Sequence, residues 1–93
     1  MQRGTIFQNK WAGFETYFIY MNHPVRTGAR EAPATAGYQI TKLNGKWVLD
    51  KAQYYYQSLR DEEHFPQVGH IDLEEAKEVF IKAILDAIGK KEE

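Results

Sequence analysis

The chain has 93 residues, enough for one domain, and its 14% of aromatic residues supply the apolar surface for a single core. There is no cysteine, which excludes disulfides, thiolate zinc sites and thiol nucleophiles. No signal peptide is evident, and no segment approaches the roughly 20 apolar residues of a membrane span, so we expect a soluble cytoplasmic protein, of bacterial or phage origin, with no membrane partner.

The net charge of −1 is distributed unevenly. Residues 1–47 hold six basic and two acidic side chains, a net charge of +4, whereas residues 48–93 hold six basic and eleven acidic ones, a net charge of −5. Such asymmetry is typical of a partner-facing surface, but it also disappears when the two halves fold together.

Residues 5–21 are rich in β-branched and aromatic side chains, and a turn near residues 9–13 predicts that they form a hairpin. Phe18 and Ile19 place apolar groups on opposite faces of the second strand, which predicts a strand covered on both sides. The next segment, residues 22–37, contains two prolines, two glycines and mostly small side chains. It predicts a long loop that is either mobile or functional.

Residues 38–51 predict a second hairpin. Asn44 and Gly45 tolerate the positive φ angles of a type I′ turn, and their flanks alternate in facing. Residues 54–59 predict a short fifth strand. Residues 60–70 are polar, contain a proline and a glycine, and predict a loop.

A C-terminal helix is predicted from about Leu73 to Ile88. Asp72 is its expected N-cap, Glu75 completes a capping box, and Gly89 suits the left-handed residue after the helix. The apolar arc of this helix is broader than contact with one sheet normally covers. We therefore expect an α+β domain with an antiparallel sheet of four to five strands, two hairpins among them, packed against the C-terminal helix.

The expected core combines residues of both hairpins and the helix: Ile6, Phe14, Phe18, Ile40, Trp47, Leu49, Leu73, Phe80, Ile84 and Ile88. The extra width of the helix comes from Ile81, Leu85 and Ile88. Either a loop such as residues 60–70 covers this flank, or the flank forms a seam for self-association.

No catalytic, metal or cofactor motif stands out. The three histidines lack metal-ligand spacing, Ser58 has no nucleophile elbow, and there is no phosphate-binding loop. The densest group of ligand types, residues 61–64, is typical of a solvated loop. We therefore expect no enzyme, no metal site and no cofactor.

The candidate interaction residues are two arginines of the long loop, two lysines of the second hairpin, one tyrosine of the run 54–56, and two apolar residues of the helix: Arg26, Arg30, Lys42, Lys46, Tyr55, Ile81 and Leu85. They support two interpretations. The first is a module for protein–protein interaction, with self-association into a homodimer included. The second is a nucleic-acid-binding module that uses a sheet face and the basic loop.

The second interpretation has some support in the order of elements from residue 38 to residue 88. With Asn44-Gly45-Lys46-Trp47 in the hairpin and Leu73-Glu74-Glu75-Ala76 at the helix start, this part resembles the three-strand-plus-helix domains that precede some tyrosine recombinases. That resemblance implies a sheet in the major groove of DNA. The charge departs from it, because residues 38–88 carry six basic and nine acidic side chains. Four cations on one exposed face would favour nucleic acid, and scattered cations would favour protein.

Overall fold

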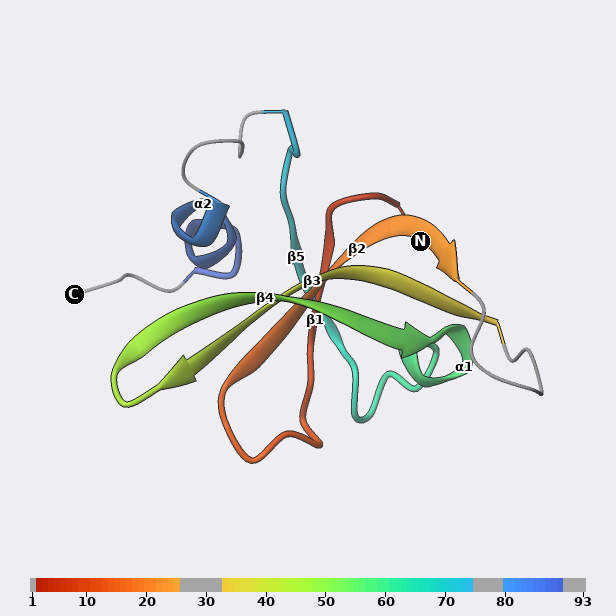
Figure 1. Cartoon of the computed structure of the whole chain (residues 1–93), viewed down its shortest axis with the longest axis horizontal. Coiled ribbons are helices and arrows are strands. Elements are labelled where there is room, and N and C mark those ends of the chain that lie inside the picture. The colour runs from red at the N-terminus through yellow and green to blue at the C-terminus, as the bar shows by residue number, and fades with distance from the viewer. Residues whose placement is uncertain (1, 26–32, 75–79, 90–93) are drawn as a thin grey trace.

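The computed structural model describes residues 2–25, 33–74 and 80–89. These contain five strands and two helices, namely β1 (Thr5–Gln8), β2 (Thr16–Val25), β3 (Ala34–Leu43), β4 (Lys46–Tyr55), α1 (Tyr56–Leu59), β5 (Gln67–His70) and α2 (Phe80–Ala87). All strand pairs are antiparallel, in the order β4-β3-β2-β1-β5, so the chain passes through four neighbouring strands and then returns to the free edge of β1 (Figure 1). The predicted α+β class is confirmed.

Both predicted hairpins are present. Asn44 and Gly45 have φ angles of 51° and 79°, as the type I′ turn between β3 and β4 requires. The turn between β1 and β2 is shaped by Asn9, whose side-chain oxygen accepts hydrogen bonds from the amides of Trp11 and Ala12 at 2.9 and 3.2 Å. This side-chain turn explains a connection whose type the sequence left undefined.

The predicted loop 22–37 is wrong at both of its ends. β2 continues to Val25 and β3 begins at Ala34, while residues 26–32 lie outside the described residues. The ladder between β2 and β3 is interrupted after Tyr20 and resumes at His23, with Asn22 at a φ of 53°. With this bulge, β2 continues through residues whose sequence predicted a loop.

The fifth strand lies elsewhere than predicted. Tyr54 and Tyr55 end β4, and residues 56–59 form α1 instead of a strand. β5 comes from the predicted loop 60–70 and pairs with β1, flanked by backbone hydrogen bonds from Gln8 to Pro66 at 3.0 Å and from Ile71 to Gly4 at 2.9 Å. Its pairing follows from the free edge of β1, which no local pattern reveals.

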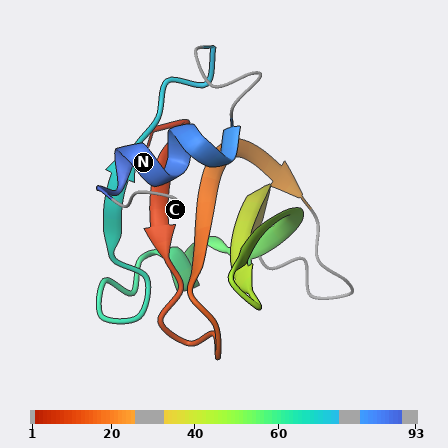
Figure 2. The ribbon, with the colours of Figure 1, turned by 90° about the vertical axis from the view of Figure 1, so that its left-hand side faces the viewer.

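The sheet carries a core on each face. The α2 face holds Ile6, Tyr17, Ile19, Ile40, Ile71, Ile84 and Leu85. The α1 face holds Phe7, Phe18, Tyr20, Leu59 and Phe65. β2 contributes to both, so the prediction that it is covered on two sides is confirmed. Figure 2 shows α2 lying across β5, β1 and β2.

The described part of the helix agrees with the prediction at its C-terminal end. Gly89 has a φ of 79° and its amide donates to the carbonyl of Asp86 at 3.1 Å. At the other end, Leu73 and Glu74 lie in a turn, and the Asp72 carboxylate accepts from the Glu74 amide at 3.0 Å. Residues 75–79, which include the expected capping-box Glu75, lie outside the described residues.

The predicted core is correct in its centre and wrong at its periphery. Ile6, Phe18, Ile40 and Ile84 are fully buried, and Trp47, Leu73, Phe80 and Ile88 are half-buried. The other two predicted core residues, Phe14 and Leu49, are exposed by 61% and 40%. Phe14 precedes β2 in the connecting turn, and Leu49 lies on β4, the edge strand of the sheet.

Candidate interaction surfaces

β4 forms an open edge of the sheet, because β3 is its only neighbour among the described strands. Leu43 and Lys46 are ladder partners that flank a two-residue turn, and the partners at this position form a hydrogen-bonded pair. Pairs then alternate along an antiparallel ladder. The peptide groups of Trp47 and of every second residue after it therefore point to the open side. The Lys42 amide supports this alternation. Lys42 lies opposite Trp47, and its amide points away from β4 and donates to the Glu15 carbonyl at 2.9 Å.

Exposed apolar side chains accompany this edge. Leu43, Val48 and Leu49 are exposed by 36%, 44% and 40%. An open edge strand with exposed apolar side chains is a ready template for pairing with another chain. Asp50 partly covers the edge, because one of its carboxylate oxygens accepts from the amide of Lys51 at 2.8 Å.

The edge is self-complementary in one antiparallel register. With a twofold axis through Val48, Lys46 of each copy lies opposite Asp50 of the other, and Trp47 lies opposite Leu49. The outward-pointing peptide groups of Trp47 and Leu49 face one another in this register, as a hydrogen-bonded pair requires. One face of the two paired strands thus matches opposite charges, and the other face matches apolar residues.

Neighbouring registers lack this match. An axis through Leu49 sets Val48 against Asp50 and leaves Lys46 opposite Ala52. An axis through Asp50 sets two carboxylates against each other, which is unfavourable. Val48 and Asp50 were not among the residues singled out from the sequence. The sequence contains a sign of their role, because Lys46 and Asp50 lie symmetrically about Val48 on a strand that follows a tight turn.

The structure places on opposite faces the two lysines that the nucleic-acid interpretation requires on one face. Lys42 pairs with Trp47 and its ammonium lies 5.7 Å from the centroid of that ring, on the α2 face. Lys46 is adjacent to Trp47 along β4, so its side chain points to the opposite face. Both lysines are exposed. Arg26 and Arg30, the other two cations of that interpretation, lie outside the described residues.

The helix flank is turned inward. Leu85 is 1% exposed and belongs to the core of the α2 face, and Ile81 is half-buried against the same core. Of the two alternatives for this flank, the burial of Leu85 favours coverage within the chain over a seam for self-association. Gly69 of β5 explains how the flank is covered, because a Cβ there would lie 2.7 Å from the Ala87 carbonyl oxygen, so helix and strand are in close contact.

The tyrosine run divides as its alternation predicts. Tyr54 and Tyr56 pack against the core of the α1 face, whereas Tyr55 is 49% exposed. The Tyr54 hydroxyl donates to the Gln39 side-chain oxygen and accepts from the Asn9 amide nitrogen at 2.8 Å. Burial raises the pKa of Tyr54. A tyrosine that stays neutral in a closed hydrogen-bond network acts as a structural group.

Near Tyr55, a groove of about 1040 Å³ lies beside α1, between Trp11 and Phe65. Trp11 is 70% exposed and meets the His64 ring edge-to-face at a centroid distance of 4.8 Å. No described feature of this groove identifies an occupant.

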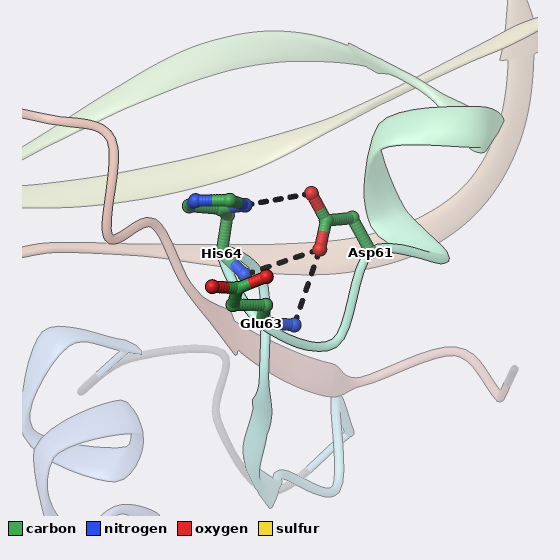
Figure 3. Close-up of side chains that lie close together, drawn as sticks. All are labelled: Asp61, Glu63 and His64. Atoms are coloured by element: carbon green, nitrogen blue, oxygen red, sulfur yellow. Dashed lines mark hydrogen bonds and ion pairs between the residues drawn. The ribbon is translucent and has the colours of Figure 1, made fainter.

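Asp61, Glu63 and His64 form the one cluster of potential metal ligands in the described ranges, with ligand atoms within 4.8 Å of one another (Figure 3). The Asp61 carboxylate is already engaged, by His64 Nδ1 at 2.7 Å and by the amides of Glu63 and His64 at 3.2 and 3.4 Å. The His64 hydrogen bond, with the backbone amides, lowers the pKa of Asp61. These contacts stabilise the turn after α1 and account for the cluster without a metal.

No helix in the described residues is long and apolar enough to cross a membrane. Comparison of the chain with protein-family models, with curated proteins and with solved structures gave no match.

Proposed function

We propose that the protein is a non-enzymatic interaction module that associates with a second copy of itself along the open edge of β4. The observation that carries the proposal is the open edge of β4, on which Lys46 and Asp50 lie symmetrically about Val48. A register between two copies centred on Val48 would satisfy the outward-pointing peptide groups, pair Lys46 with Asp50 twice and bring Trp47 against Leu49 twice. Pairing by strand addition joins the two sheets into one.

The placement of the lysines favours protein over nucleic acid as the partner. A nucleic-acid reader with few cations needs them on one face. Lys42 and Lys46 point to opposite faces of the hairpin, and Lys42 lies over Trp47. Lys46 instead lies in the alternating row with Val48 and Asp50, where it matches a second copy.

A single cysteine tests the register. The natural chain has no cysteine, so Val48→Cys introduces one thiol per copy. Residues on the axis form a non-hydrogen-bonded pair with Cα atoms about 4.5 Å apart, which a disulfide can bridge. We expect mild oxidation to give a disulfide-linked dimer. Leu49→Cys, a neighbour of similar exposure, is the matched control and should cross-link much more weakly. Stronger linkage at residue 49 would refute the register.

A charge exchange tests the pairing in the unmodified chain. Lys46→Asp and Asp50→Lys each place like charges opposite one another and should weaken the dimer in sedimentation experiments. The double variant Lys46→Asp/Asp50→Lys restores opposite charges and should recover much of the association. A natural chain that is monomeric at all accessible concentrations would contradict the proposed function itself.

A further inference from the structure

Three basic side chains from separate segments of the chain meet around one cavity. Arg3, His23 and Lys51 border a hollow of about 530 Å³ on the sheet, and none of its described lining residues is acidic. The remaining walls include Met21 and Tyr38, which offer apolar and aromatic surface. On β4 the cavity is lined by Lys51, Ala52 and Gln53, which follow the segment 46–50 that is proposed to pair in the dimer.

The bulge in β2 places His23 at this cavity. Tyr20 pairs with Gly37, and the next paired residue of β2 is His23, opposite Ala36. In a regular ladder, Met21 would occupy that position. Because the bulge inserts two residues, with Asn22 at a φ of 53°, His23 takes the place opposite Ala36. Bulges commonly redirect a side chain towards a site in this way.

Small residues leave the space open. Ala36, Gly37 and Ala52 lie side by side on β3 and β4 and form part of the lining. Gly37 is fixed by packing, because a Cβ there would lie 2.3 Å from the Ile19 carbonyl oxygen and 2.8 Å from the Phe18 ring. A longer side chain at Ala36 would fill the hollow.

The backbone holds Arg3 at the mouth of the cavity. The next residue, Gly4, has a φ of 91° and donates to the Tyr20 carbonyl at 2.7 Å. The Arg3 carbonyl accepts from His70 Nε2 at 2.9 Å. A Cβ at Gly4 would lie only 2.2 Å from the Ile71 carbonyl oxygen, so the turn is closely packed. The backbone of Arg3 is therefore well positioned, and the residue as a whole is exposed.

Among the described residues, the positive charges at the cavity have no ion-pair partner. Within the described ranges, the one ion pair is between Asp61 and His64, so neither Arg3 nor Lys51 is paired. A guanidinium fork, an ammonium and an imidazole are the donors that bind phosphate oxygens. The hollow is much larger than a phosphate ion and falls in the range of small-molecule sites, about 300–1,000 Å³. Tyr38, held edge-to-face by Phe80 at a centroid distance of 5.3 Å, supplies a firm wall for an organic group.

We propose that this cavity binds the phosphate group of a small organic molecule, with Arg3 and Lys51 on the phosphate and Met21 and Tyr38 against the organic part. Phenyl phosphate, inorganic phosphate and benzoate are the probes, titrated into the full chain while the amide and side-chain resonances are followed by NMR. We expect saturable shifts at His23, Tyr38 and Lys51, with phenyl phosphate binding more tightly than the other two. Equal affinity for benzoate would overturn the assignment to phosphate, and equal affinity for inorganic phosphate would overturn the assignment to an organic ligand.

Matched variants test the residues. Arg3→Gln should weaken phenyl phosphate binding by about 10-fold, the order expected for one charge-assisted contact. Arg60→Gln, which removes an exposed arginine next to α1, should leave the affinity unchanged. Lys51→Gln and Lys10→Gln form the second pair. Equal losses in the members of either pair, or no saturation with any probe, would refute the site. Cross-linking at Val48 measures dimer formation separately, so failure of this site and failure of the proposed dimer are distinguishable.

Discussion

At the scale of single residues, burial on the α2 face decides which substitutions are costly. Ile84 is fully buried between helix and sheet. Ile84→Ala should lower the free energy of unfolding by about 2–5 kcal/mol, through lost transfer energy and the cavity it leaves. Phe14→Ala removes a larger but exposed side chain and should cost about 0.5 kcal/mol or less. Urea unfolding of both variants measures the difference, and equal losses would show that Ile84 is not in the core.

A second residue-scale prediction concerns Asp61. Its pKa is lowered from 3.8, chiefly by the hydrogen bond from His64. Because the folded pKa lies below the unfolded one, the carboxylate stabilises the fold above the unfolded pKa. That contribution is lost as the pH falls through the folded pKa. NMR titration should therefore place the Asp61 carboxyl midpoint below 3.8.

Asp61→Asn keeps an oxygen for the backbone amides but removes the charge. Its unfolding free energy should fall less steeply than that of the natural chain between about pH 5 and pH 3. A midpoint at or above 3.8 in the natural chain, or identical pH profiles for both proteins, would show that the turn does not favour the ionised carboxylate.

Single residues also show where sequence reasoning stops. Alternation correctly assigns Trp47 and Leu49 to one face of their strand, but it cannot show that the strand is at an edge and that its tip extends past the helix. Arg3 and Lys51 are 48 positions apart in the sequence, and no local pattern joins them. They line one cavity because β1, which Arg3 precedes, and β4 belong to the same sheet, and the bulge in β2 adds His23 to them.

At the scale of elements, the contact between β5 and α2 depends on Gly69. A Cβ at this position would lie 2.7 Å from the Ala87 carbonyl oxygen, closer than real Cβ contacts. Gly69→Ala should push helix and strand apart and increase hydrogen exchange in residues 80–87. Gly13→Ala, where an added Cβ meets nothing within 4 Å, is the control and should leave exchange in the helix unchanged. Unchanged exchange in Gly69→Ala would show that the helix is not held against β5.

Elements that are specified by their own residues could be predicted from the sequence, and elements that depend on pairing with another element could not. Asn44 and Gly45 specify their turn whatever surrounds them. β5, in contrast, contains Gly69 and follows Pro66, both of which indicate a loop. It becomes a strand because β1 offers unpaired peptide groups. The run Tyr54–Tyr56 has high β-propensity, yet the chain turns into α1 to cover one face of the sheet, where Leu59 is buried.

At the scale of the whole molecule, the fold mixes the two oppositely charged halves of the sequence. β3 from the basic half pairs along its length with β4, which begins in the basic half and ends in the acidic half. The charge asymmetry of the sequence is thus not an asymmetry of two domains. What remains is local: the cations around the cavity on the α2 face, and the Lys46 and Asp50 pair beside an open strand.

Association along β4 should make thermal stability depend on concentration. A partner that binds only the folded chain raises its stability by mass action, and here the partner is the chain itself. The melting temperature of the natural protein should therefore rise with protein concentration, and the rise should shrink at high salt because exposed ion pairs are screened. In Lys46→Asp, like charges face each other across the axis, and the melting temperature should be nearly independent of concentration. Lys10→Asp, the same exchange outside β4, should behave like the natural chain. A concentration-dependent rise that is equal in all three proteins would mean that association uses another surface.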